Sequence, residues 1–197
     1  MAYLPFNIRE RLLASGKEEF LAHGFGKASL RTICKKAGLT TGAFYNHFSG
    51  KEELFNVLVE PMICDFRKMY EDVMMQELAD LTTGVNNELI SITCAIKYKD
   101  EFRLLFDCSD GTKYEGFKEY LIHQLFYPGY QAVFDRYAGK PVDPSLVLLI
   151  LHMKFTEYME LIYGGYTMDE VQKLITQISI FSEGGFKCLL GALNKEE

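Results

Sequence analysis

The sequence predicts an all-α protein of about nine helices, divided between a small N-terminal domain and a larger C-terminal helical bundle. Apolar residues recur at three- and four-residue spacing along most of the chain, and capping residues precede these segments. No segment alternates between apolar and polar residues as a strand would. The 197 residues, 48% of them apolar, are enough to build one or two hydrophobic cores.

The first helix is expected to begin at a capping box, the pairing of Asn7 with Glu10, and to end at Gly24. Its apolar stripe consists of Ile8, Leu12, Leu13 and Phe20. We expect this helix to pack behind the two helices that follow it.

The next two helices are short and are joined by a tight turn, which predicts a helix-turn-helix. Ser29 is a suitable N-cap for a helix over 30–37, and Gly38 can take the left-handed conformation that ends it. Thr40 then caps the second helix of the pair.

The second helix of this pair has two distinct faces. Phe44 and Phe48 lie four residues apart and can pack inward. The opposite face carries small residues and polar side chains, namely Gly42, Ala43, Tyr45 and Asn46. Such a face suits the major groove of DNA, which admits an α-helix and is read by polar groups at the base edges.

A fourth helix is expected to begin at a second capping box, Ser49 with Glu52, and to run to about Leu78. Lys51 lies in its first turn, where free backbone N–H groups and the helix dipole favour a phosphate. Pro61 removes one backbone hydrogen bond, so we expect a kink or a restart there.

The rest of the chain is also predicted to form helices separated by turns. They are a helix through Leu89–Ile96, a short one over 100–107, a long one from Thr112 through Phe134, one over 144–163 and one over 168–192. The last three begin at Thr112 with Glu115, at Asp143 followed by Pro144, and at Thr167 with Glu170. Pro128 and Gly129 are expected to bend the long helix.

Charge is divided unevenly along the chain. Residues 1–51 contain eight Lys or Arg against three Glu, a balance of +5, and residues 52–197 contain 13 against 24 acidic residues, a balance of −11. The basic part coincides with the helix-turn-helix, as binding to phosphates requires. We expect the acidic part to lie away from DNA.

The segment GFGKASLRTICKKAGLTTGAFYNHFSGKEELF resembles the DNA-binding module of the TetR family of bacterial transcriptional regulators. The resemblance rests on the glycine-phenylalanine entry, the spacing of Ile33 and Gly38, the run Gly42–Tyr45, the pair His47-Phe48, and Lys51-Glu52 at the next helix. The sequence departs from the family at Cys34, where alanine is usual. Cysteine is also small and apolar, so we expect the helices to pack closely there as well.

The motif and the charge division predict a helix-turn-helix DNA-binding domain over 1–50. The resemblance implies a ligand-binding and dimerisation domain over 51–197. We assign phosphate contacts to Thr40, Tyr45, His47 and Lys51, groove-floor contacts to Thr41, Gly42, Ala43 and Asn46, and either kind of contact to Arg31.

The resemblance also implies a small-molecule pocket in the C-terminal domain. Our candidates for its lining are aromatic residues at helical spacing, namely Phe66, Tyr70, Phe102, Phe106, Phe117, Phe155 and Tyr158. Aromatic stripes form packed cores more often than pockets, so a closed bundle is the alternative.

No pattern commits the chain to catalysis, a cofactor or a metal. The sequence has no G-x-S-x-G, P-loop, H-E-x-x-H or dinucleotide glycine motif. Its five cysteines are scattered without a CxxC pair, and no two histidines lie four residues apart. This pattern argues against a zinc site and against a disulfide framework.

The sequence therefore predicts a DNA-binding transcriptional regulator rather than an enzyme. We expect a cytoplasmic homodimer formed by the last two helices, because the N-terminus lacks a secretory signal, no segment is apolar enough to span a membrane, and one module reads too few base pairs. The resemblance implies a repressor that a small-molecule effector releases from a pseudo-palindromic operator, with the fourth helix linking pocket and DNA-reading helices. The alternative is a DNA-bound scaffold that acts through a protein partner without an inducer.

Overall fold

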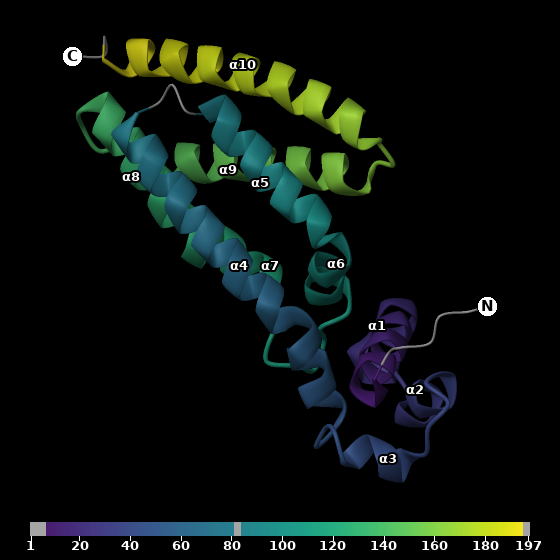
Figure 1. Cartoon of the computed structure of the whole chain (residues 1–197). Coiled ribbons are helices and arrows are strands. Elements are labelled where there is room, and N and C mark those ends of the chain that lie inside the picture. Colours follow the sequence, from purple (N-terminus) through teal and green to yellow (C-terminus); the bar gives the residue numbers. More distant parts are fainter. Residues whose placement is uncertain (1–6, 81–83, 195–197) are drawn as a thin grey trace. The chain divides into compact units, whose positions relative to one another are not determined.

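The structure, a computed structural model, describes residues 7–80 and 84–194, and every regular element in these ranges is a helix (Figure 1). The elements are α1 (Ile8–Lys27), α2 (Leu30–Lys36), α3 (Thr41–Tyr45), α4 (Lys51–Ala79), α5 (Gly84–Lys97), α6 (Lys99–Asp107), α7 (Phe117–Tyr120), the π-helix η2 (Leu121–Phe126), α8 (Tyr127–Ala138), α9 (Pro144–Tyr163) and α10 (Met168–Leu193). The run from α7 through η2 to α8 is continuous. With this run counted once, the described residues form nine helices, which confirms the predicted all-α class.

Several helices begin where their caps predict. Asn7 with Glu10 and Thr167 with Glu170 form reciprocal capping boxes at α1 and α10. The Asp143 carboxylate caps α9 by accepting a backbone hydrogen bond of 2.8 Å. These side chains satisfy N–H groups that have no partner inside the helix, so they fix where each helix starts.

Two other expected capping boxes are replaced by different hydrogen bonds. The Ser49 N–H donates to the carboxylate of Glu53 at 2.6 Å instead of to Glu52, so the acceptor lies one residue further along α4. The Thr112 hydroxyl closes a local turn, and the next helix begins only at Phe117.

The prolines inside helices have unequal effects. α4 continues through Pro61 to Ala79, so this proline does not end the helix. Pro128 has no N–H to donate to the carbonyl four residues earlier, and the six residues before α8 are wound as π-helix. A Cβ at Gly129 would lie 2.7 Å from the Tyr70 hydroxyl, so glycine is needed for the close approach of α8 to α4.

The helices form two compact units, each described by itself below. Unit 1 contains the described residues up to Cys64 together with Asp100–Lys118, and unit 2 contains Asp65–Lys99 together with the described residues from Glu119 on. α4 contributes its first part to unit 1 and its second part to unit 2. The division by contacts therefore does not follow the boundary that we expected after residue 50.

Unit 1 has an aromatic core. Phe20 and Phe55 are fully buried and meet edge to face at a centroid distance of 5.2 Å. A Cβ at Gly16 would lie 2.5 Å from a Leu54 methyl carbon, so glycine permits α1 and α4 to touch. Gly24, with φ of 73°, interrupts α1 as expected, but the chain resumes a helical turn beyond it.

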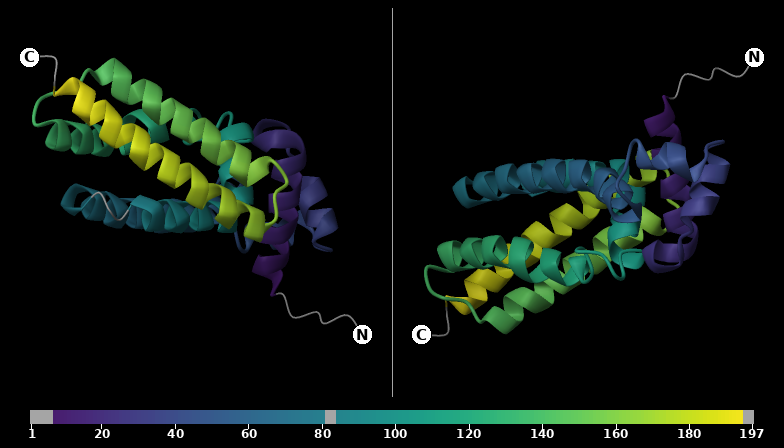
Figure 2. Two further views of the ribbon diagram at one scale, coloured as in Figure 1. Left: turned by 90° about the horizontal axis from the view of Figure 1, so that it is seen from above. Right: turned by 90° about the horizontal axis from the view of Figure 1, so that it is seen from below.

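Unit 2 is a helical bundle in which α9 and α10 are consecutive and run in opposite directions (Figures 1 and 2). α10 packs mainly on α5, and α9 packs on α8 and α5. One of its cores contains Phe134, Ala138, Val142, Val147 and Leu190. Within the described residues, no helix combines the length and the apolar composition that crossing a membrane requires.

Candidate functional site

The helix-turn-helix is built by α2, the turn at Gly38 and α3. The Ser29 hydroxyl accepts the Thr32 N–H at 3.4 Å, and the Thr40 hydroxyl accepts the Ala43 N–H at 3.2 Å, which starts the two helices as predicted. Gly38 has φ of 67°, the left-handed conformation that the turn requires.

Buried side chains hold this motif in place. Phe44 and Phe48 are 0% and 1% exposed and stack at a centroid distance of 5.5 Å. Cys34, which departs from the family pattern, is 2% exposed and is accommodated in the core. The Arg11 guanidinium donates to the Ala37 carbonyl at the end of α2, so α1 also fixes the turn.

Most residues predicted to contact DNA are accessible. Those that the structure leaves exposed are Arg31, Thr40, Thr41, Gly42, Tyr45, Asn46 and His47, whereas Ala43 is partly buried. A Cβ at Gly42 would meet only the Thr40 hydroxyl, at 3.8 Å, so the backbone of α3 is open to close approach. One face of α3 and its flanking residues is therefore accessible and mainly polar, and consists of Thr40, Thr41, Gly42, Tyr45, Asn46 and His47.

The Lys51 ammonium, which we expected to contact a phosphate, is hydrogen-bonded within the protein. Its ammonium donates to the carbonyl oxygens of Phe25 at 2.6 Å, Gly26 at 3.3 Å and Ala28 at 3.3 Å, and lies 4.5 Å from the centre of the Phe25 ring. A phosphate contact by this ammonium would compete with hydrogen bonds that join the end of α1 to the start of α4. This geometry favours a structural role for the Lys51 side chain.

The seven aromatic residues predicted to line a pocket are divided between the two units. Phe102, Phe106 and Phe117 belong to unit 1, where their rings pack in series at centroid distances of 5.5 and 6.4 Å. In unit 2 the buried Tyr70 donates to the Phe126 carbonyl at 3.0 Å. The other members in unit 2 are Phe66, Phe155 and Tyr158, of which the first two are buried and the third is partly buried.

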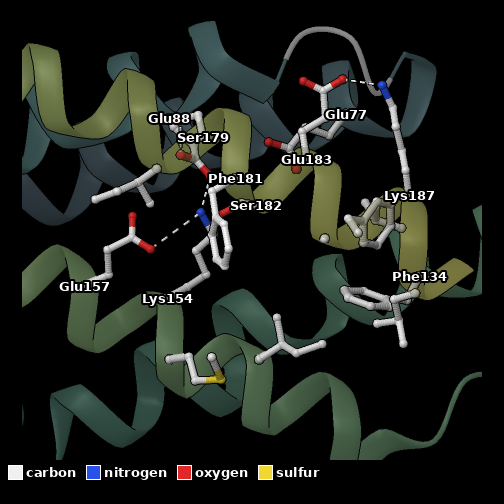
Figure 3. Close-up of a pocket in the computed structure, with 17 residues that line it drawn as sticks. Glu77, Glu88, Phe134, Lys154, Glu157, Ser179, Phe181, Ser182, Glu183 and Lys187 are labelled. Atoms are coloured by element: carbon white, nitrogen blue, oxygen red, sulfur yellow. Dashed lines mark hydrogen bonds and ion pairs between the residues drawn. The ribbon is translucent and has the colours of Figure 1, made fainter.

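Unit 2 contains a cavity of about 610 Å³ bounded by α4, α5, α8, α9 and α10 (Figure 3). Its apolar lining comprises Val133, Phe134, Ile150, Met153, Ile178, Phe181, Phe186 and Leu189. Its charged lining comprises Glu77, Glu88, Lys154, Glu157, Glu183 and Lys187. None of the seven predicted aromatic residues is among the lining residues, because those rings fill the cores instead.

Lys154 is the centre of a partly buried charge cluster on the cavity wall. Its ammonium, on a side chain only 15% exposed, donates to one oxygen of Glu88, whose other oxygen accepts the Ser179 hydroxyl. Glu157 on the next turn of α9 places one oxygen 3.8 Å from this ammonium. The other Glu157 oxygen is buried and accepts no hydrogen bond from the described residues.

Burial shifts the protonation of two of these carboxyl groups. It raises the pKa of Glu77 to about 7, with a further increase from the negative charge of Glu88 and opposing effects from Asn87 and Lys154. Burial also raises the pKa of Glu157, an effect that Lys154 opposes. Carboxylates in this cavity are therefore poorly solvated and incompletely paired.

From the sequence, only Glu157 and Glu160 among the acidic residues were candidates for contact with a polar or cationic ligand, and Glu77, Glu88 and Lys154 were missed. The residues come from α4, α5 and α9, and each appears in the sequence as an ordinary charged residue in an apolar helix. An available signal was Glu88, the single acidic residue of α5, which directly precedes the apolar part of that helix. Glu160, which lies one turn beyond Glu157 on α9, is exposed and does not line the cavity.

The described residues hold no group of three or more His, Cys, Asp or Glu side chains placed to bind a metal ion. The five cysteines are free thiols, of which Cys34 and Cys108 are buried and Cys64 and Cys188 are exposed. Burial raises the pKa of the Cys34 and Cys108 thiols, so at neutral pH they act as small apolar side chains.

Comparison with known proteins connects the N-terminal site with transcriptional regulation. Residues 12–58 match the family described as bacterial regulatory proteins, tetR family. The chain is 32% identical over 105 residues to the HTH-type transcriptional regulator YdgC of Bacillus subtilis. This aligned region covers 53% of this chain and 51% of that protein. It is 31% identical over 81 residues to the HTH-type transcriptional repressor AcnR of Corynebacterium efficiens, covering 41% and 42% of the two chains. The chain thus spans about half the length of these curated relatives or less.

The fold also matches over most of its length. The crystal structure of a transcriptional regulator of the TerR/AcrR family from Aquifex aeolicus superposes with a TM-score of 0.61 at 19% identity, covering 87% of this chain and 96% of that one. At this identity the likeness concerns the fold alone. The names of these matched proteins describe regulators of transcription rather than enzymes.

Proposed function

Because the chain belongs through its N-terminal domain to the TetR family of bacterial regulatory proteins, we propose that it represses transcription from an operator and is released by a small-molecule effector. The observation that carries this proposal is the open, polar surface of α3 on the part of the chain with positive net charge. AcnR, a matched relative, is described as a repressor, which supports this direction of regulation. Such a protein acts where the DNA is, so we propose a cytoplasmic location.

We propose that α3 enters the major groove. Thr41, Gly42, Ala43 and Asn46 would face the groove floor, where the absence of a side chain at Gly42 permits close docking. The residues proposed to hold phosphates are Arg31, Thr40, Tyr45 and His47, all of which are exposed. Lys51 would support this surface by fixing the start of α4 against the end of α1.

Exposed apolar residues on α9 and α10 support a homodimer through these helices. Leu149 on α9 and Ile180 on α10 are 60% and 61% exposed, and neither lines the cavity. Exposed apolar side chains that gather on one surface mark an interaction site, whereas single ones do not. Gly184, Gly185 and Gly191 lie within the unbroken α10 with open space at each Cβ position, which permits a partner helix to approach.

The cavity in unit 2 favours a ligand-responsive repressor over a scaffold that works only through a protein partner. α4 belongs in part to each unit, so it is the proposed connection between effector binding and DNA binding. Linkage requires that effector and operator weaken each other by the same factor, commonly about 5–150-fold in coupled systems.

The test is to select a binding site from random DNA with the full chain and then to compare variants. We expect enrichment of an inverted repeat with half-site centres about one helical turn, 34–36 Å, apart. Gly42→Leu should weaken binding to that site about 100-fold or more while leaving the urea unfolding midpoint unchanged, because the added side chain meets open space in the free protein. Ala14→Leu adds similar bulk on the exposed face of α1 and should leave binding within about twofold. Failure to enrich any sequence, or equal effects of the two variants, would contradict the proposed function.

A further inference from the structure

We propose that the unit 2 cavity binds an amphipathic organic cation, a molecule with a protonated amine or amidine head on an apolar or aromatic body. This inference rests on the proposed function, since it names the chemical class of the effector. It depends on the shape of the cavity, on its charge balance, and on one carboxylate oxygen that has no partner among the described residues.

The size and apolar walls of the cavity select the body of the ligand. A volume of about 610 Å³ lies in the range of small-molecule sites, which are concave and mainly apolar with a few polar groups. Phe134 and Phe186 on facing helices meet edge to face at 4.7 Å, and Phe181 projects from α10 toward α9 (Figure 3). Aromatic faces also attract a cation through their quadrupoles.

The charges of the cavity select the head of the ligand. Four glutamates face two lysines on the lining, an excess of two negative charges if all are ionised. Lys187 pairs with Glu183 on the same helix, and Lys154 is shared between Glu88 and Glu157. Lys154 therefore faces more carboxylate than it can neutralise, and the balance of charge favours a cation over an anion.

Glu157 provides a specific position for the head. One of its oxygens already lies beside Lys154, whereas Oε1 is buried and accepts no hydrogen bond from the described residues. A buried carboxylate oxygen without a donor is destabilised, so a turn of the Glu157 side chain that brings this oxygen to an N–H group of a bound cation would be favourable. A carboxylate ligand such as a fatty acid would add to the repulsion instead.

The experiment uses three probes that share one apolar chain and differ in the charge of the head: decylammonium, decan-1-ol and decanoate. Binding to the full chain is measured by calorimetry without DNA. We expect decylammonium to bind at least about tenfold more tightly than the alcohol and decanoate to bind most weakly, because only the head charge changes.

Two variants locate the head group. Glu157→Gln keeps the shape of the side chain, removes its charge, and should weaken decylammonium binding about tenfold while leaving decan-1-ol unchanged. Glu160→Gln makes the same change of charge on the exposed face of α9 and should leave both affinities within about twofold. Equal affinity for the three probes, or equal effects of the two variants, would overturn the proposal.

The pH dependence of decylammonium binding provides a second measurement, because a purely structural role of Glu77 would not change it. Its raised pKa means that this carboxyl group loses its proton near pH 7, whereas burial raises the pKa values of Tyr70, Tyr130 and Tyr158 further above this range; the charged side chains that act on Glu77 are Glu88 and Lys154. The affinity for decylammonium should therefore increase between pH 6 and 8, and this increase should disappear in Glu77→Gln. An unchanged pH dependence in that variant would remove Glu77 from the site.

Operator binding is measured separately, so the two proposals can fail independently. A protein that binds decylammonium as described but keeps its operator affinity has the cation site without the proposed regulation. A protein that binds its operator but discriminates none of the three probes is a DNA-binding regulator whose cavity does not bind organic cations.

Discussion

The two units bury charge in different ways. In unit 1 the carboxylate of Glu19 is almost fully buried, and it accepts the Ser29 N–H at 3.2 Å and pairs with Lys36 at 3.3 Å. In unit 2 Glu77 and Glu157 border a cavity and have raised pKa values because burial is incompletely offset by partners. Under the proposed function, unit 1 would hold a fixed surface for DNA binding, whereas unit 2 would retain charge that a bound effector can stabilise. DNA binding by a preorganised surface and a response to a ligand would require these different arrangements.

The largest difference between the units should appear when one phenylalanine is truncated in each. Phe55→Ala removes a fully buried ring that contacts Phe20, Phe25 and Tyr114, and should lower the free energy of unfolding by about 3–5 kcal/mol. Phe181→Ala removes a ring that is 80% exposed, and should change the stability of the monomer by less than about 1 kcal/mol.

Urea denaturation of both variants at low protein concentration measures this difference. The low concentration matters because a dimer through α10 would couple Phe181 to assembly. A loss of several kcal/mol for Phe181→Ala under these conditions would mean that the cavity wall is part of the folding core, and the contrast between the units would fail.

A smaller effect should come from the buried charge of unit 2 and should depend on pH. The folded pKa of Glu77, about 7, lies above its ordinary value of 4.5, so the folded protein binds more protons than the unfolded chain between these values. Its contribution to stability is therefore present at low pH and is lost as pH rises through about 7. Between pH 5.5 and 8 the native protein should lose roughly 1–2 kcal/mol more than Glu77→Gln, which cannot ionise.

The control for this prediction lies within the same pair of proteins. At pH 4 Glu77 is mainly protonated in both the folded and the unfolded state, so the native protein and Glu77→Gln should unfold at similar urea concentrations. Parallel stability curves from pH 5.5 to 8 would show that this carboxyl group is solvated, and the described difference between the units would lose its electrostatic basis.

The sequence predicted the local features well because their causes are local. Asn7, Ser29, Thr40, Asp143 and Thr167 all cap helices as expected, since a cap depends on residues within one helical turn. The helix-turn-helix also follows from short-range spacing, which is why its exposed and buried faces were predicted together.

The cavity could not be predicted in the same way, because it depends on contacts between distant segments. Glu88 and Ser179 are 91 positions apart in the chain, yet they share a hydrogen bond. Phe102 and Phe117 were expected to line the pocket because they are aromatic residues at helical spacing. Their rings instead pack within unit 1. Helical periodicity identifies which residues turn inward, but it does not distinguish a filled core from a hollow one.

An effect of similar size concerns Lys51, for which the sequence and the structure indicate different roles. From the sequence alone, loss of a phosphate contact should lower the slope of log K against log salt by about one. In the structure the ammonium donates to three carbonyl oxygens in unit 1, so Lys51→Met should instead lower the free energy of unfolding by about 1–2 kcal/mol. Lys35→Met, a matched change on the exposed surface of α2, should leave stability within about 0.5 kcal/mol.

Measuring operator affinity of both variants from 50 to 200 mM salt separates the two roles of Lys51. We expect Lys51→Met to weaken binding at every salt concentration with an unchanged slope, because the ammonium positions α1 against α4 and does not displace counterions from DNA. A slope reduced by about one, with stability unaltered, would show that the ammonium leaves the carbonyl oxygens for a phosphate when DNA binds. In that case the recognition surface of unit 1 would rearrange on binding, and the contrast between a fixed unit 1 and a responsive unit 2 would no longer hold.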